Sequence, residues 1–270
     1  MNRPLAEQDD RYRTLFLEPI RVCGAYRPAF GAGRSGNDRE ITLAAFTALF
    51  AADPLYDWIG LNSPLMYAAH KAAGGMTSVY RQIGIGCERL VRAIIQDHLE
   101  LDDDEVRWGY DTIRSDGQAQ RLTLDARIDL TQLGNPEARR RVSDWLTRAS
   151  AFISQHRDVA GSVFEVRQGY KSADAKRQNA DLRFGLAAYD EGYLPVILVI
   201  STQVSNVVIQ RYRQNKLLVL TGILADDDTV TTYAFFDRVV GYSLRGFFER
   251  NADAIRAEVT AILTALLSPA

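Results

Sequence analysis

The sequence has few of the residues that cross-link a chain or anchor it in a membrane. It holds only two cysteines, Cys23 and Cys87, and three histidines that lie far apart. Two cysteines give no disulfide framework, and a zinc site would lack a ligand cluster. No apolar run approaches the roughly 20 residues that a membrane-spanning helix needs, and residues 1–10 lack the apolar segment of a secretion signal. We therefore expect a cytoplasmic protein that does not enter a membrane.

An excess of positive charge is also missing. Lysine and arginine total 32 against 34 for aspartate and glutamate, which gives a formal net charge of −2. Indiscriminate binding to phosphate backbones is therefore not expected, because domains that bind in this way are usually basic. Binding to nucleic acid depends more on the local electrostatic potential of one face than on the net charge of the chain, however. Cations gather in Arg139-Arg140-Arg141, where a solvated helix face is the favoured interpretation, and between residues 167 and 183.

Hydrophobic residues make up 47% of the 270 residues, which is enough for a core. They are arranged in segments that alternate between helical and strand periodicity. The pattern predicts one α/β domain over residues 1–270, with a mixed central sheet flanked by helices. Residues 1–100 form a mainly helical N-terminal portion, residues 101–240 the α/β core, and residues 241–270 a C-terminal helix. We expect helices near 37–52, 64–74, 78–98, 135–156, 172–190, 204–213 and 243–267, and strands near 106–113, 120–130, 162–168, 195–200, 216–221 and 229–236.

Acidic side chains stand on the polar face of one predicted strand. Between residues 120 and 130 apolar and polar residues alternate, so Asp125 and Asp129 share a face. Asp129 lies at the end of the strand, and we prefer it to Asp125 as a functional carboxylate for that reason.

A second strand carries a carboxylate and a cation two residues apart. Glu165 and Arg167 share one face of strand 162–168. Spacing alone slightly favours an exposed structural pair on this face. A carboxylate in a mostly apolar strand is costly unless it is paired or bound to a metal, and Mg²⁺ takes only one or two acidic ligands besides phosphate and water. Together with Asp129, the pattern therefore predicts a metal-dependent attack on a phosphodiester.

These segments resemble the PD-(D/E)XK nuclease superfamily, in which an aspartate ending one strand and a Glu-x-Lys pair on the next hold a divalent metal. More narrowly, Gly75–Leu90 and Phe164–Asp181 resemble type II restriction endonucleases of the ApaLI-like kind. The resemblance extends from about residue 60 to 250 and includes Ile200–Gln203 and Thr232–Phe235.

The resemblance implies a restriction-endonuclease-like fold and a site-specific deoxyribonuclease that uses Mg²⁺ to cut both strands of a short palindrome. It implies Asp129 and Glu165 as metal ligands, with Glu88 as an additional carboxylate. The chain departs from the pattern at Arg167, where a lysine is expected. Arginine stabilises charge but does not act as a base. Two other residues therefore remain alternatives for the role of the motif lysine. Lys171 would fold back over Gly169 to fill it, and Gln168 would require a bulge in the strand.

Side chains that suit base edges follow the proposed metal site. Arginine and lysine suit guanine, while asparagine and glutamine suit adenine. A solvated helix surface is an equally good interpretation for any one of these residues. Since enzymes of this kind read palindromes as two-fold dimers, we also expect a homodimer. The candidates for contact with double-stranded DNA are Gln168, Lys176, Arg177, Asn179, Arg183 and Gln203.

Two other functions fit the same residues. A structure-selective repair or recombination nuclease would cut branched or mismatched DNA without a fixed sequence. A DNA-binding protein that has kept the nuclease fold without cleaving is favoured by the arginine at position 167.

Overall fold

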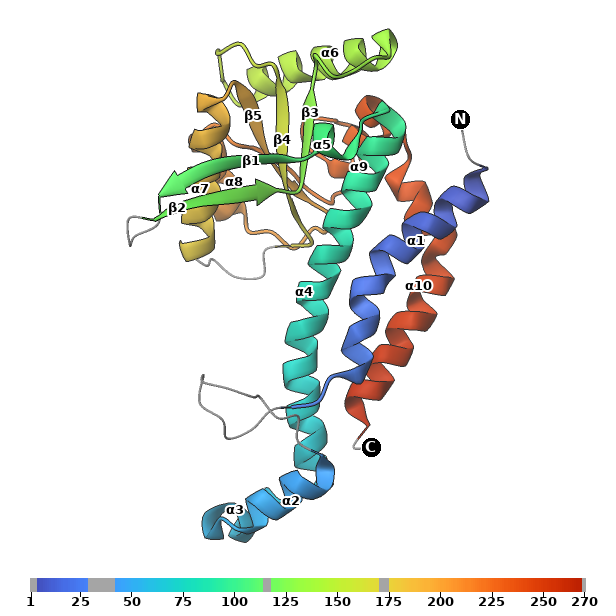
Figure 1. The fold of residues 1–270 in the computed structure, drawn as a ribbon, viewed down its shortest axis with the longest axis vertical. Helices are drawn as coiled ribbons and strands as arrows, with labels where there is room; N and C mark the ends of the chain where they lie inside the picture. Colours follow the sequence, from blue (N-terminus) through green and yellow to red (C-terminus); the bar gives the residue numbers. More distant parts are fainter. Residues whose placement is uncertain (1–3, 29–41, 114–117, 170–174, 269–270) are drawn as a thin grey trace. The chain divides into compact units, whose positions relative to one another are not determined.

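The computed structural model describes residues 4–28, 42–113, 118–169 and 175–268 (Figure 1). The chain divides into two compact units, one of residues 1–12 and 87–250, the other of residues 13–86 and 251–270. Helices α1 (Leu5–Arg21), α4 (Pro64–Leu99) and α10 (Leu244–Leu267) contribute residues to both units. The limits expected at residues 100 and 240 do not coincide with these units.

The first unit contains a mixed sheet with the strand order β3-β4-β5-β6. Strand β3 (Ala126–Asp129) is antiparallel to β4 (Gly161–Arg167), whereas β4, β5 (Tyr193–Val199) and β6 (Leu218–Leu220) are parallel. A separate hairpin of β1 (Trp108–Ile113) and β2 (Ala119–Leu124) precedes β3. The predicted α/β class, with a mixed sheet flanked by helices, is confirmed.

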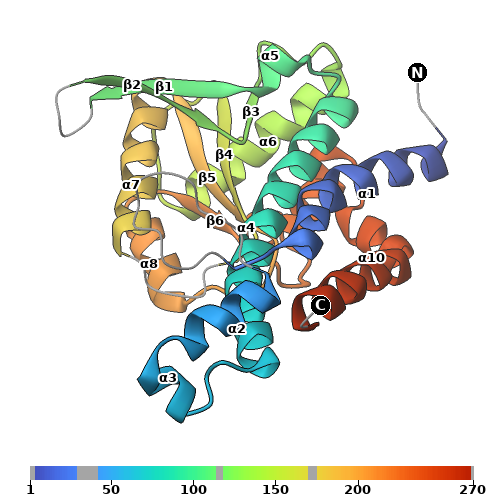
Figure 2. The same ribbon diagram turned by 60° about the horizontal axis from the view of Figure 1, so that its bottom comes forward.

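Different helices cover the two faces of this sheet (Figures 1 and 2). On one face Val163 packs in a core with Phe184 of α7 (Ala175–Asp190) and Tyr212 of α8 (Asn206–Gln214). On the other face Phe164 contacts the rings of Trp145, from α6 (Pro136–Phe152), and Phe235. Because successive residues of a strand point to opposite faces, Glu165 and Arg167 lie on the face covered by α7 and α8.

Helix α4 is unbroken from Pro64 to Leu99, although we expected it to end at Gly74-Gly75. Its glycines allow close packing instead of ending the helix. A Cβ atom on Gly75 would lie 2.4 Å from Leu266 Cδ2, and one on Gly86 would lie 2.3 Å from the Phe16 carbonyl oxygen. Tertiary contacts of this kind outweigh the low helix propensity of glycine.

The strand predicted at 229–236 is wrong. Thr231 forms an isolated bridge with Thr221 and then caps helix α9 (Thr232–Phe235), accepting hydrogen bonds from the N–H groups of Tyr233 and Ala234. A π-helical segment, η2 (Phe236–Val240), follows directly. The acidic run after Leu101 forms the short helix α5 (Asp103–Val106).

The second unit is helical. Asp53 caps α3 (Pro54–Trp58), so Asp53-Pro54 ends α2 (Leu43–Ala51) and starts another helix. The predicted start of α2 at residue 37 or 38 lies outside the described residues. Helix α1 and the 3₁₀ segment η1 (Val22–Ala25) had not been predicted. Within the described part of the chain, no helix has both the length and the apolar character needed to cross a membrane.

Candidate active site

Asp125 interrupts the strand that we predicted over residues 120–130. Its main-chain N–H donates to the carbonyl of Phe164 at 3.3 Å, and its Oδ2 accepts from the main-chain N–H of Val166 at 2.8 Å. The carboxylate therefore takes a hydrogen bond that a main-chain carbonyl would otherwise accept, which separates β2 from β3. Since Ala126 pairs with Phe164, this bond fixes the Asp125 side chain level with Glu165.

Asp129 does not lie beside Glu165, so the predicted pairing of these two residues is wrong. Strand β3 runs antiparallel to β4, and its last residue, Asp129, therefore pairs with the first residue of β4, Gly161. Glu165 lies four positions along the strand from Gly161, a distance of about 13 Å at the usual rise per residue. Asp125, which directly precedes β3, occupies the position that we had expected for Asp129.

The Asp129 carboxylate has structural partners of its own. Its Oδ1 accepts hydrogen bonds from the N–H and the hydroxyl of Thr131, and its Oδ2 accepts from the Tyr193 hydroxyl at 2.7 Å. Burial opposes ionisation of this group, but these hydrogen bonds hold the pKa of Asp129 below its usual value. The arrangement stabilises the turn that follows β3.

Arg167 joins two carboxylates that come from different elements. Its guanidinium forms an ion pair with Glu165, and its Nη2 donates to Asp181 Oδ1, on α7, at 3.0 Å. The other oxygen of Asp181 accepts a hydrogen bond from the hydroxyl of Tyr212, on α8, at 2.7 Å. Glu165 and Arg167 therefore form the predicted same-face pair, but their side chains are each 16% exposed, so the pair is mostly buried and not exposed as expected. Asp181 and Tyr212 were missed, because no sequence spacing links these helices to β4.

The site is short of positive charge. Burial raises the pKa of Glu165 to about 8; Arg167 lowers it, whereas the charges of Asp125 and Asp181 raise it further. Burial also raises the pKa of Asp125, against the hydrogen bond from Val166 and the charge of Arg167. The Arg167 guanidinium bridges Glu165 and Asp181, and both Arg167 and Arg92 lower the pKa of Asp125. Burial nevertheless keeps the pKa values of Glu165 and Asp125 raised, and an added cation would favour their ionised forms.

The oxygen atoms at this point suit a hard divalent cation. Asp125 and Glu165 supply two carboxylates, and the carbonyl of Val166, which accepts from Arg167 Nη1 at 3.4 Å, lies beside them. Among the described residues no group of three His, Cys, Asp or Glu side chains is arranged to hold a metal. Two carboxylates with water and substrate phosphate are nevertheless the set that Mg²⁺ commonly uses.

Glu88 lies on the side of α4 that approaches Asp125. Four residues further along the helix, Arg92 donates through Nε to the carbonyl of Asp125 at 2.7 Å. Residues four apart share a helix face, and Glu88 is half-buried there. Glu88 therefore lies on the same face of α4 as Arg92, and its role as a third carboxylate stays a prediction.

Two of the predicted DNA-binding residues, Gln168 and Gln203, lie in the segments that follow β4 and β5. The Ser201 N–H donates to the Gln168 carbonyl at 3.2 Å, and a Cβ atom on Gly169 would lie 3.3 Å from the Gln203 carbonyl. Gln203 is exposed and Gln168 half-buried. Parallel strands bring these side chains to one edge, beside the segment that follows Arg167.

The remaining DNA-binding candidates belong to helix α7 and the segment before it. Arg183 and Asn179 are exposed on α7, and Asn179 Oδ1 accepts from Arg211 Nη2 at 2.7 Å. Lys171 lies outside the described residues, as do the side chains of Lys176 and Arg177. The structure therefore adds Arg211 to the polar surface around Asn179.

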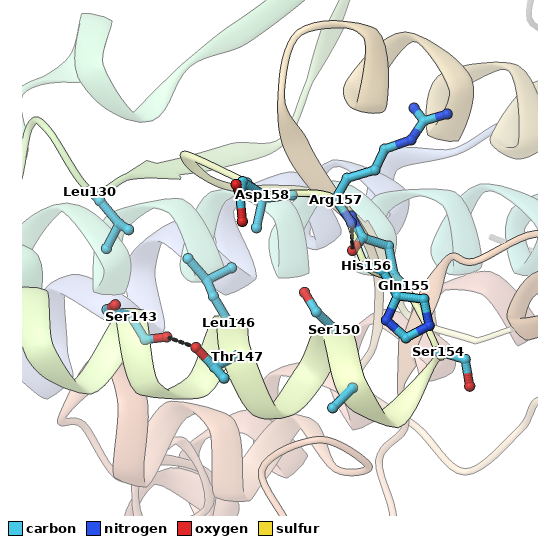
Figure 3. A pocket seen from close by; sticks show the side chains of 12 residues that line it. Leu130, Ser143, Leu146, Thr147, Ser150, Ser154, Gln155, His156, Arg157 and Asp158 are labelled. Atoms are coloured by element: carbon cyan, nitrogen blue, oxygen red, sulfur yellow. Dashed lines mark hydrogen bonds between the residues drawn. The ribbon is translucent and has the colours of Figure 1, made fainter.

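Two large cavities lie along α6 instead of at this carboxylate cluster. One, of about 430 Å³, is lined by Ser143, Ser150 and the segment 154–159, with the exposed His156 in its wall (Figure 3). It contains none of the residues that the resemblance implied, and it belongs to the helix that covers the opposite face of the sheet.

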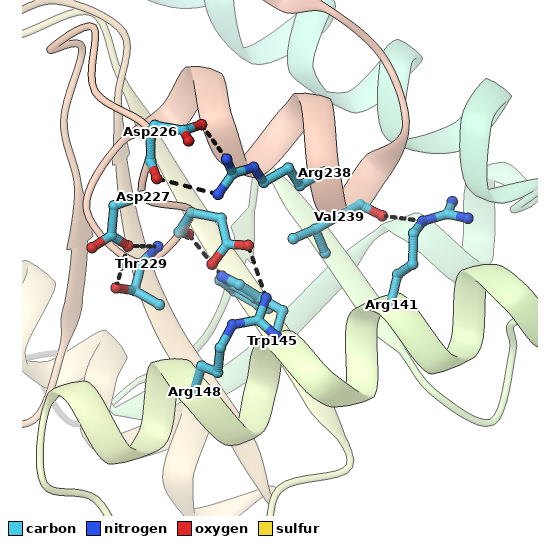
Figure 4. A network of polar contacts seen from close by, with 9 residues as sticks. Arg141, Trp145, Arg148, Asp226, Asp227, Thr229, Arg238 and Val239 are labelled. Atoms are coloured by element: carbon cyan, nitrogen blue, oxygen red, sulfur yellow. Dashed lines mark hydrogen bonds and ion pairs between the residues drawn. The ribbon is translucent and has the colours of Figure 1, made fainter.

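The second cavity, of about 820 Å³, is lined by arginines and by the acidic segment 226–228. Arg148 donates to Asp228 Oδ2 at 2.8 Å, and Figure 4 shows Arg238 bonded to Asp226 at this place. Arg141 donates through Nε to the Val239 carbonyl at 3.3 Å. Arg141 and Arg148 therefore join α6 to the segments after β6, whereas the pair of Arg238 and Asp226 lies within those segments.

The triple arginine is part of the α6 surface, as favoured from the sequence. Arg139 donates to the carbonyl of Leu133, and both Arg139 and Arg140 are exposed.

No protein-family model, curated protein or solved structure matches this chain.

Proposed function

We propose that the protein is a type II, site-specific deoxyribonuclease that hydrolyses double-stranded DNA at a short palindrome in the presence of Mg²⁺. The observation that carries this proposal is the carboxylate pair of Asp125 and Glu165. Asp125 is fixed level with Glu165 by its bond to Val166, and the Arg167 guanidinium lies against Glu165. A carboxylate pair beside a cation, on neighbouring segments, suits metal-dependent hydrolysis of a phosphodiester.

Asp125 and Glu165 would hold the metal, with the Val166 carbonyl as a third oxygen and Glu88 as a further carboxylate. When bound, Mg²⁺ supplies a Lewis acid that polarises a phosphoryl oxygen. Arg167 stabilises negative charge on the phosphate, because a guanidinium keeps its proton and presents several donors. It does not act as a general base.

DNA would lie along the edge formed by Gln168 and Gln203 and across the start of α7. Asn179 and Arg183 are exposed on this helix, and Lys176 and Arg177 precede them in the sequence. Amide and guanidinium groups suit base edges in the major groove. Reading a palindrome by such a surface requires two copies of the chain related by a two-fold axis.

A second candidate is a DNA-binding protein that does not cleave. It is favoured by the Arg167 guanidinium, which compensates Glu165 and Asp181 without a metal. In this case the carboxylate cluster would have only a structural role and would not bind a metal.

One experiment separates these functions. The protein is incubated with long duplex DNA and Mg²⁺, and the ends of the products are sequenced. Discrete fragments that share one short motif support the site-specific nuclease. Cleavage confined to branched or mismatched DNA supports a structure-selective nuclease, and tight binding without cleavage supports the second candidate.

A further inference from the structure

The Arg167 guanidinium lies between two carboxylates that differ in how firmly they are held. Glu165 precedes it by two residues on the same strand, and its side chain is 16% exposed. Asp181 comes from α7, is only 3% exposed, and accepts from Arg167 Nη2 at 3.0 Å. One cation therefore serves two anions, one at the rim of the site and one inside the protein.

Asp181 is anchored from a second helix. Its Oδ2 accepts the Tyr212 hydroxyl at 2.7 Å, and the Tyr212 side chain, on α8, is fully buried. A carboxylate inside a protein needs donors for both of its oxygens, and Asp181 receives them from Arg167 and Tyr212. This chain of contacts links the guanidinium to the core between the two helices and the sheet.

We propose that Asp181 is a positioning residue that retains Arg167 at the site when a divalent cation takes Glu165. The inference rests on the proposed function, since it requires Glu165 to be a metal ligand. A cation that takes the Glu165 oxygens removes one partner from Arg167, and the guanidinium then stays in place through Asp181. Without Asp181, Arg167 turns to Glu165 and competes with the cation for its oxygens.

The test measures binding of Mn²⁺ alone, without DNA, by the electron paramagnetic resonance signal of the free ion. Asp181→Asn keeps the size of the side chain and removes its charge. We expect the Kd for Mn²⁺ to rise by about 10- to 100-fold, as is typical when a residue behind a metal ligand is changed. Activity is not needed for this readout.

A double-mutant cycle distinguishes positioning from the simple loss of a negative charge near the metal. In protein that carries Arg167→Met, there is no guanidinium for Asp181 to position. We expect Asp181→Asn to change the Kd by less than about twofold in this background. An equal rise in both backgrounds would show that Asp181 acts through its own charge and would overturn the inference.

The remaining outcomes are also decisive. An unchanged Kd in Asp181→Asn protein that melts cooperatively overturns the inference and leaves the proposed function standing. Absence of Mn²⁺ binding by the unaltered protein overturns both. If Asp181→Asn does not fold, Tyr212→Phe, which keeps the buried ring and removes the hydroxyl donor, is expected to raise the Kd by a smaller factor. No rise in that variant overturns the inference.

Discussion

The Oδ2 atom of Asp125 accepts a hydrogen bond from the main-chain N–H of Val166 at 2.8 Å. A side chain thus completes the ladder between β3 and β4, and its carboxylate is held next to Glu165. This contact distinguishes Asp125 from Asp129, whose carboxylate is bonded to Thr131 and Tyr193.

Asp125→Asn and Glu165→Gln are expected to lower the rate of DNA cleavage by about 10²- to 10⁴-fold, because each removes a charge from the metal site. Asp129→Asn is the matched control, an aspartate at the other end of the same strand, and should cut at close to the unaltered rate. Cleavage rates are measured on one duplex substrate, with melting temperatures to verify folding. Loss of cleavage in the Asp129 variant alone would restore that residue to the site.

Binding of a divalent cation should depend on pH. Because burial raises the pKa of Glu165 to about 8, a proton competes with a metal ion for this carboxyl at neutral pH. The affinity for Mn²⁺ should therefore rise by about tenfold per pH unit below 8 and level off above it. Titrations at several pH values test this, and Glu165→Gln should remove the dependence. An affinity that is flat through this range contradicts the assignment of Glu165.

The same shift determines how Glu165 affects stability in the absence of metal. Its pKa lies at about 8 in the folded protein against 4.5 for the free group, so between these values the folded protein binds more protons than the unfolded chain. The contribution of Glu165 to the free energy of unfolding is therefore greatest at low pH and is lost as the pH rises through about 8. Denaturant titrations should show that Glu165→Gln weakens this decline.

Arg167 is expected to be the cation that the cleavage step requires. It lies against Glu165, so Arg167→Ala should lower the cleavage rate by about 10²-fold or more, since it removes charge stabilisation at the phosphate. Lys171→Ala should mainly weaken salt-dependent DNA binding. Rates and affinities must be compared at one salt concentration, and the reverse pattern would assign the role to Lys171.

Arg183, exposed on α7, should contribute to DNA binding. Arg183→Ala is expected to weaken affinity for all sequences and to reduce the slope of log K against log salt by about 1 if it contacts a phosphate. Arg140→Ala is the control, because Arg140 is an exposed arginine on α6, which covers the opposite face of the sheet. Equal losses in both variants would place DNA elsewhere.

Two glycines of α4 should respond to alanine in opposite directions. Gly86→Ala is expected to lower the free energy of unfolding by about 1–3 kcal/mol, because its Cβ would lie 2.3 Å from the Phe16 carbonyl oxygen. At Gly84 a Cβ atom would meet no neighbouring side chain or other segment of the described chain within 4 Å, so Gly84→Ala should stabilise the helix by up to about 1 kcal/mol. Denaturant unfolding of the two variants tests the contrast.

The sequence predicted which segments form the strands of the site better than it predicted which residues of neighbouring strands lie opposite one another. The apolar run 195–200 predicted a strand buried on both faces, and β5 is buried along its whole length. Alternation placed Asp125 and Asp129 on one face but did not distinguish them, because their distances from Glu165 depend on antiparallel pairing with a strand 30 residues away. Asp181 is brought to Arg167 by the packing of α7 on the sheet, which no local pattern encodes.

The most direct test of the account is to sequence the ends of long duplex DNA after incubation with the protein and Mg²⁺, for the unaltered chain and for the Asp125→Asn and Asp129→Asn variants. The account predicts discrete fragments that share one short palindromic motif with the unaltered chain and with Asp129→Asn, and none with Asp125→Asn. Tight binding of intact DNA, or cleavage by Asp125→Asn at the unaltered rate, would contradict it.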